Sequence, residues 1–349
     1  MPTNRSVVVA VCVLLVVGLG IYLGSGTSVP RVVVYCALDR EFAEDVLAEF
    51  TKRTGLEVDK RYDTEASKSV GLYDDLIREA GRPRCDVHWN NEILATIRLQ
   101  RQGVYASYES PAALPFPAQY KAADHTWTAF AARARVLIVN ARKAWPELPS
   151  SITDLTKPEL KGRVVMAKPL FGTTATHAAC LFQTWGDANA RDFFEKLKAN
   201  DVQIVAGNKQ VAVEVGAGRM DIGLTDTDDA LAEIDQGRPV AMIFPDGDGF
   251  FPESALGTLF IPNTVAMIKN CPNPEGAKKL IDYLLNPEVE AKLAVGDSRQ
   301  IPLNPHVKVD MPAVMRPART ARPLPVDFSK AADAWGESQR FLKDLFALR

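Results

Sequence analysis

The chain has 349 residues, of which 47% are hydrophobic and 24% are charged, a balance typical of globular proteins. This length exceeds what one simple hydrophobic core requires and favours two compact domains. The 41 basic and 43 acidic residues leave a net charge of −2, with no basic stripe, so nothing in the charge indicates a nucleic-acid partner.

The N-terminus has the pattern of an export signal. Arg5 precedes an uninterrupted apolar run over residues 7–23, and small polar residues follow at 24–28. The run is close to the minimum length of a membrane span, so an uncleaved anchor is the alternative. We therefore expect residues 1–28 to be a signal peptide or an N-terminal membrane anchor. The rest of the chain is expected in the periplasm or elsewhere outside the cytoplasm.

Strands and helices are predicted to alternate after this segment. Residues 32–35 are apolar and β-branched, and a helix follows that ends at Gly55. A second strand begins at Leu56, and a helix over residues 73–79 leads to a third strand at 86–89. Such units indicate a parallel sheet covered on both faces, whose ligands meet the loops after the strands.

Two long apolar strands are predicted at residues 127–140 and 259–268, with a complete α/β pattern between them. This order predicts an α/β protein with two lobes joined by two crossover strands. Lobe 1 is predicted to comprise residues 29–128 plus 257–349, and lobe 2 to comprise residues 129–256. A Pro-rich surface loop is expected at 111–117 and a final helix at 334–348.

The cysteines do not have the spacing of a zinc site. Cys12 lies in the N-terminal apolar run. A single disulfide could form among Cys36, Cys85, Cys180 and Cys271, and the sequence does not choose a pair.

The order and spacing of several phrases resemble the ferric-ion-binding family of periplasmic solute-binding proteins, from about Arg31 to Leu303. The phrases lie at residues 33–35, 54–58, 85–87, 132–136, 160–164, 171–174 and 273–284. The resemblance implies a periplasmic-binding-protein-like fold and a role as the solute-binding part of an ABC importer. It implies an ABC permease in the cytoplasmic membrane as partner, a monomeric protein without enzymatic activity or catalytic cofactor, and a metal ion held with a companion anion in the interlobe cleft.

The resemblance also assigns residues to the anion. Gly172, Thr173 and Thr174 match a turn at a helix N-terminus that holds the anion in the family, and Asn208 matches an amide position. Free N–H groups at a helix start attract negative charge, which supports the assignment. Arg133 is expected to add a charge-assisted contact. The alternative is that Thr173 and Thr174 only cap the helix that follows.

The metal-binding half departs from the family. Iron-binding members commonly carry adjacent tyrosines after the strand at residues 222–224, whereas this chain has Thr-Asp-Thr-Asp-Asp at 225–229. The candidate ligands are therefore mostly acids and amides, with one tyrosine: Tyr35, Asp39, Glu65, Asn91, Glu92, Asp226, Asp228 and Asp229. Carboxylate oxygens suit a hard cation, and they equally suit the ammonium group of a zwitterion such as an aminoalkyl phosphonate. The alternatives are that Asp228 and Asp229 only start a helix, and that Glu65 lies in an ordinary surface loop.

A phosphohydrolase of the haloacid dehalogenase type is the best enzyme alternative. Asp226-Thr227-Asp228 after a strand fits its DxD phrase, in which the first Asp attacks phosphorus. That phrase normally follows the first strand, whereas here more than two hundred residues precede it, and no later Asp completes the second phrase. The sequence therefore favours a binding protein.

Overall fold

The computed structural model describes residues 31–63, 71–245 and 257–348. The predicted signal or anchor at 1–28 and the candidate Glu65 lie outside the described residues. None of the described helices is long and apolar enough to span a membrane.

The first part of the chain builds a parallel sheet. Its elements are β1 (Arg31–Cys36), α2 (Arg40–Thr54), β2 (Glu57–Tyr62), α3 (Gly71–Arg78), β3 (Val87–Asn90) and α4 (Ile93–Arg101). β1 lies between β2 and β3 and pairs parallel with both, as the alternating pattern predicts. α2 buries its apolar stripe and ends at Gly55, whose φ of 70° favours glycine.

A second parallel sheet follows. Its elements are β6 (Val164–Ala167), α5 (Gly172–Trp185), α6 (Asp187–Ala199), β7 (Gln203–Val205), α7 (Asn208–Gly216), β8 (Ile222–Asp226), α8 (Thr227–Asp235) and β9 (Val240–Ile243). β6 pairs parallel with β7 and with β8. The carboxyl ends of β6, β7 and β8 therefore face the same way, toward the starts of α5, α7 and α8.

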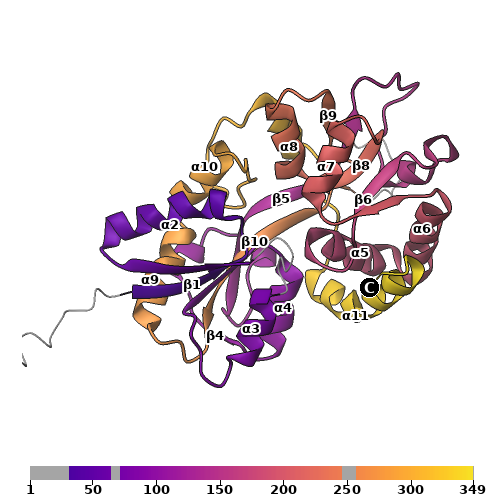
Figure 1. Cartoon of the computed structure of the whole chain (residues 1–349). Helices are drawn as coiled ribbons and strands as arrows, with labels where there is room; N and C mark the ends of the chain where they lie inside the picture. The colour runs from indigo at the N-terminus through magenta and orange to yellow at the C-terminus, as the bar shows by residue number, and fades with distance from the viewer. Residues whose placement is uncertain (1–30, 64–70, 246–256, 349) are drawn as a thin grey trace, which may run out of the picture.

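Two long strands join the two sheets. β5 (Trp127–Asn140) is buried along its whole length and pairs antiparallel with β10 (Phe260–Ile268). β10 also pairs with β3, and β5 also pairs with β8, which gives the strand order β2-β1-β3-β10-β5-β8-β6-β7. In Figure 1, β5 and β10 run between the two groups of elements. The predicted fold of two α/β lobes joined by two crossover strands is confirmed, while the boundaries given for the lobes stay a prediction.

The crossover strands contain a bulge where they leave one sheet for the other. Their register shifts between Pro262 and Asn263, opposite Ala131, whose φ is 43°. The amide of Ala131 donates to the buried Glu290 carboxylate of α10 (Pro287–Val295) at 2.6 Å. A bulge bends its strand, so this contact fixes a bend at the joint between the lobes.

The C-terminal part covers both sheets. It comprises α9 (Pro274–Leu284), α10 and α11 (Phe328–Leu345). A short strand from earlier in the chain, β4 (Tyr105–Ala106), pairs with β10. α11 packs against α4 of the first group and against α5 of the second. It begins earlier than predicted because Asp327 caps it by accepting from the amide of Lys330. Short 3-10 turns lie at Pro111–Ala113, Ala118–Tyr120, Ile152–Thr156, Pro158–Leu160 and Ala313–Arg319.

The four cysteines in the described residues are all free thiols. Cys36, Cys85 and Cys180 are buried and Cys271 is half-buried. Burial raises the pKa of the Cys271 thiol to about 11. The structure therefore contains none of the disulfides that the sequence left open.

Candidate functional site

A pocket of about 260 Å³ lies where the starts of several helices meet, and we call it the cleft pocket. Ten of the predicted site residues line it: Asp39, Asn91, Arg133, Gly172, Thr173, Thr174, Asn208, Asp226, Asp228 and Asp229. Asp39 and Asn91 follow β1 and β3 of the first sheet, and Arg133 comes from crossover strand β5. The others lie at the end of β8 or at the starts of α5, α7 and α8. The topology thus gathers at one place residues that are up to 190 positions apart in the sequence.

The pocket receives helix N-termini because parallel strands end on the side where the next helices begin. α5 and α7 begin after Phe171 and Gly207, and neither of these residues caps its helix with a side chain. Uncapped N–H groups and the helix dipole favour negative charge. The prediction that Thr173 and Thr174 are simple caps is wrong, because the N-cap position belongs to Phe171.

A fully buried arginine organises the second-sheet side of the pocket. Arg135 is 0% exposed, and its Nη1 donates to Asp226 Oδ1 at 2.6 Å and to the Asn208 side chain at 3.1 Å. Thr173 donates its hydroxyl to Asp226 Oδ2 at 2.6 Å, and Asn208 Nδ2 donates to the same oxygen at 3.1 Å. Burial raises the pKa of Asp226, but Arg135 and Arg133 outweigh it, and the pKa lies below its usual value. Asp226 is therefore an ionised carboxylate whose two oxygens already accept hydrogen bonds.

Arg133 joins the two sides of the pocket. Its Nη2 donates to the backbone oxygen of Asn91 at 2.8 Å, and its Nη1 lies 3.4 Å from Asp228 Oδ2. Burial lowers the pKa of Arg133, but the surrounding aspartates, Asp228 first, raise it overall. The guanidinium therefore stays charged inside the pocket.

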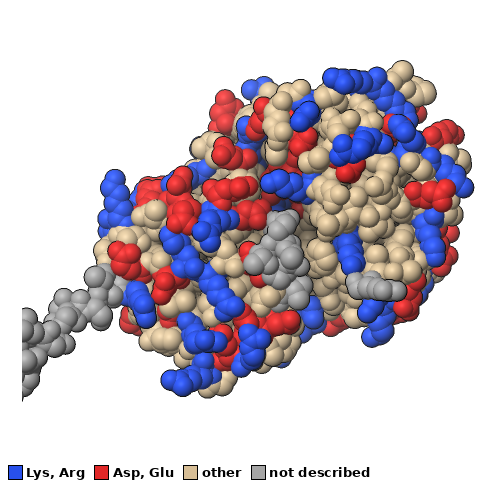
Figure 2. Space-filling model, in the orientation of Figure 1, with Lys and Arg blue, Asp and Glu red and all other residues tan. Residues whose placement is uncertain are grey.

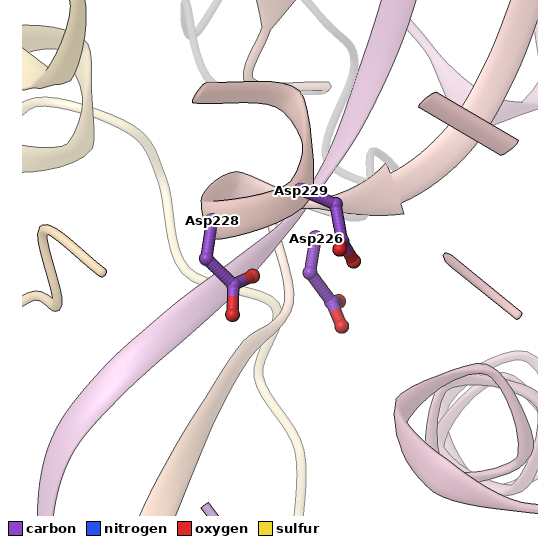
Figure 3. Close-up of side chains that lie close together, drawn as sticks. All are labelled: Asp226, Asp228 and Asp229. Carbon is purple, nitrogen blue, oxygen red and sulfur yellow. The ribbon is translucent and has the colours of Figure 1, made fainter. Parts of the chain in front are cut away.

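Three carboxylates form the acidic wall of the pocket. Asp226, Asp228 and Asp229 each offer an oxygen, and these oxygens lie within 4.8 Å of one another. Figure 3 shows the three side chains projecting from the end of β8 and the start of α8 toward the same space. Asp228 and Asp229 lie in the first turn of α8, so they are both wall residues and helix-starting acids.

The described lining as a whole carries both signs of charge. Its five acids are Asp39, Glu41, Asp226, Asp228 and Asp229, and its four bases are Arg40, Arg133, Lys168 and Lys209. On the face of the molecule seen in Figure 2, basic and acidic side chains are likewise interspersed. A ligand of one sign would meet repulsion in part of such a pocket, whereas a ligand of both signs finds complementary charge for each end.

Two predicted ligands lie elsewhere. The Tyr35 hydroxyl donates to Glu79 at 2.9 Å and accepts from Arg61 at 3.2 Å, and neither partner lines the cleft pocket. Side chains alternate along β1, so Tyr35 packs on the sheet face opposite to that of its neighbours in the strand, Val34 and Cys36. The assignment of Tyr35 to the ligand site is therefore corrected.

Glu92 is also corrected, because its carboxylate caps α4. It accepts from the amides of Leu94 and Ala95 at 2.6 and 2.7 Å, and the Thr176 hydroxyl of α5 donates to the same carboxylate. Only 2% of Glu92 is exposed, and burial raises the pKa of this carboxyl. Its neighbour Asn91 lines the pocket, while Glu92 lies behind it in the contact between α4 and α5.

The sequence reasoning missed Arg135 and the basic residues Arg40, Lys168 and Lys209. A signal for Arg135 exists, because Arg133 and Arg135 are two residues apart in a long strand that is otherwise almost entirely apolar. Two arginines on one face of a buried strand need acidic partners. The pattern indicates that partners must exist, and it does not say which acids they are.

The chain is similar to known transport proteins. Residues 95–320 match the family model of the bacterial extracellular solute-binding proteins. "Iron uptake protein A1" of Synechocystis is 26% identical over 254 residues, which is 72% of this chain and 69% of that protein. The "Putative 2-aminoethylphosphonate-binding periplasmic protein" of Salmonella paratyphi A is 25% identical over 252 residues, 70% of this chain and 69% of that protein.

The same fold occurs in solved structures. Iron-bound HitA from Pseudomonas aeruginosa superposes with a TM-score of 0.79 and 21% sequence identity, covering 90% of this chain and 99% of HitA. At this identity the likeness establishes the arrangement of the elements and not the ligand.

Proposed function

Because the chain belongs to the bacterial extracellular solute-binding proteins and is the solute-binding component of an ABC importer, we propose that its cargo is a small organic zwitterion, with an aminoalkyl phosphonate as the type. The observation that carries this proposal is the mixed lining of the cleft pocket, in which five acids face four bases.

Each charged end of such a ligand would lie beside pocket groups of opposite charge. The phosphonate would lie at the uncapped starts of α5 and α7, beside Lys168 and Lys209. Backbone N–H groups and the helix dipoles favour an oxyanion there. The ammonium would lie between Asp39 of the first sheet and Asp228 and Asp229 of the second. A ligand that contacts both sheets favours the closed arrangement of the lobes, since it gains contacts that an open arrangement lacks.

A metal ion with a companion anion is the second candidate, favoured by the three oxygens within 4.8 Å of one another. Two features weigh against it. No tyrosine lines the described part of the pocket, so a ferric ion would lack phenolate ligands. The oxygens of Asp226 are also engaged by Arg135, Thr173 and Asn208. The donor set thus fits a metal ion poorly.

A matched ligand series tests the proposal by calorimetry. 2-Aminoethylphosphonate supplies both charges, ethylphosphonate supplies only the anion, and ethylamine supplies only the cation. We expect micromolar binding of the first and at least about 100-fold weaker binding of each half, since each charged contact is worth about 1.5–3 kcal/mol. Stoichiometric binding of ferric ion with carbonate or phosphate, and no binding in the zwitterion series, would reverse the choice between the two candidates.

Location and partners follow from the same role. The protein is proposed to work as a monomer in the periplasm, delivering its cargo to an ABC permease in the cytoplasmic membrane, and to lack catalytic activity. Its relatives include the "Fe(3+)-binding periplasmic protein" of Serratia marcescens, which supports the location. Fractionation of cells that express the full chain tests it, and recovery in the cytoplasm would contradict it.

A further inference from the structure

Three side-chain donors from three different elements converge on one carboxylate in the wall of the cleft pocket. Arg135 of β5 and Thr173 of α5 each donate to Asp226 at 2.6 Å, and Asn208 of α7 donates at 3.1 Å. We call Arg135, Thr173 and Asn208 the oxyanion cradle. Asp226 stands at the end of β8 and is 2% exposed, and its carboxylate lies where these three donors meet.

The cradle has the chemistry of a site for a small oxyanion. A guanidinium, a hydroxyl and a carboxamide NH₂ are the groups that hold carboxylate and phosphate oxygens in proteins. The donors also bond to one another, with Asn208 Nδ2 donating to the Thr173 oxygen at 2.8 Å and Thr173 in reach of Arg135 at 3.2 Å. Such cross-links restrain the positions of the three groups relative to one another.

We propose that this cradle is an oxyanion-binding site filled from within by Asp226. The carboxylate of Asp226 stands where a free anion would otherwise lie, so this protein carries its companion anion as a side chain. Two of the residues that the family resemblance assigns to an external anion, Thr173 and Asn208, are thereby withdrawn from the cargo. The anionic end of the cargo must then lie at the backbone N–H groups of α5 and α7, a consequence that rests on the proposed function.

Chemical rescue tests the cradle. Asp226→Ala removes the built-in anion and leaves Arg135 buried without its counter-ion. We expect the full-length variant to melt at a lower temperature than the wild type. Formate, and then phosphate, at tens of millimolar should raise its melting temperature by at least about 5 °C, because an anion that binds only the folded state stabilises it by mass action. Sodium chloride of equal ionic strength should not do so, and the gain in formate or phosphate over chloride should be larger in Asp226→Ala than in the wild type.

A double variant supplies the matched control. Asp226→Ala combined with Arg135→Met removes both charges, so formate and phosphate should raise its melting temperature over that in chloride no more than they do for the wild type. Rescue that persists in the double variant, or equal effects of all salts on Asp226→Ala, would overturn the proposal. If Asp226→Ala does not fold, Asp226→Asn takes its place, since the amide keeps one acceptor for Arg135 while losing the charge. Its gain in melting temperature in formate or phosphate over chloride must then exceed that of the wild type, and equal gains would refute the cradle.

The test does not depend on the cargo. Melting temperatures are measured with formate, phosphate and chloride alone, so a failed zwitterion series would leave the rescue experiment interpretable. Conversely, an absent rescue would leave the calorimetric series unaffected.

Discussion

The starts of α4 and α8 each carry a carboxylate that is 2% exposed, and the two carboxylates have opposite electrostatic surroundings. Glu92 at α4 accepts hydrogen bonds only from neutral groups, namely two backbone amides and the Thr176 hydroxyl, and burial raises its pKa. Asp226 at α8 accepts from the Arg135 guanidinium. Burial raises the pKa of Asp226 too, but Arg135 and Arg133 lower it more.

The difference shows that a buried acid acquires its role from its partners rather than from its position at a helix start. Because its donors are neutral, Glu92 acts as a helix cap, and its bond from Thr176 links α4 to α5. A guanidinium makes Asp226 a permanent anion that organises the pocket wall. The two sites look alike in the sequence, because each is an acid between a strand and a helix. The following substitutions test whether Glu92 and Asp226 have different roles.

The largest loss of stability is expected from removing Arg135, the cation that pairs with Asp226 at the start of α8. Arg135→Met leaves Asp226 buried without its hydrogen-bonded counter-charge, and breaking such a pair should lower the free energy of unfolding by about 3–5 kcal/mol. Urea denaturation measures it. Arg163→Met is the matched control, because Arg163 also pairs with an aspartate, Asp221, but is about half exposed, and Lys143 stays beside that acid. The control should cost at most about 1 kcal/mol, and equal losses in both variants would remove the special role of Arg135.

A smaller effect is expected on cargo binding at the same helix. Asp228→Asn removes the charge that is proposed to face the ammonium, so affinity for 2-aminoethylphosphonate should fall about 30-fold, or about 2 kcal/mol. Asp235→Asn is the control, since Asp235 also lies on α8 but pairs with Arg299 outside the pocket. Calorimetry on both variants decides the matter, and wild-type affinity in Asp228→Asn would remove the acidic wall from the mechanism.

The contact at α4 should be weaker than the pair at α8. Thr176→Val removes the hydroxyl donor to Glu92 and keeps the shape of the side chain, while the two amides remain. Thermal unfolding should show a loss of about 1.5–3 kcal/mol, the value of a hydrogen bond to a charged group. Thr184→Val on the same helix is the control, because its hydroxyl only donates to the backbone oxygen of Cys180. A loss in Thr176→Val no larger than in the control would mean that this bond does not stabilise the contact.

The smallest effect is a difference in pH dependence. Because the pKa of Glu92 is raised above its usual 4.5, the folded state binds a proton before the unfolded state does. Wild-type stability relative to Glu92→Gln should therefore rise as the pH falls from neutral to about 4.5. Asp226 has a lowered pKa, so its contribution is lost only as the pH falls below its usual 3.8.

Urea denaturation of the wild type and of Glu92→Gln at several pH values measures this difference. The other buried acids whose pKa is raised by burial, Asp86 and Glu290, are present in both proteins, so their contributions cancel. A stability difference that is independent of pH between 7 and 4.5 would show that Glu92 keeps an ordinary pKa in the folded state.

The elements of the fold were largely predictable from the sequence. The limits predicted for the first crossover strand, 127–140, are those of β5, because an apolar run of this length needs burial on both faces. The starts of the helices around the pocket were also predictable, since each follows a short apolar strand. Ten candidate site residues meet in one pocket for the same reason, as the ends of parallel strands share an edge of the sheet.

The sequence, through its local periodicity, its strand order and its resemblance to a known family, determined the two-lobed fold, the crossover strands and ten of the residues that line the cleft pocket. Only the tertiary structure decided what each charge does. Arg135 and Asp226 lie 91 residues apart, and Glu92 and Thr176 lie 84 apart, so no local pattern relates them. A carboxylate is a cap, a counter-ion or a ligand according to the donors that reach its two oxygens, and chain packing brings those donors from distant parts of the sequence.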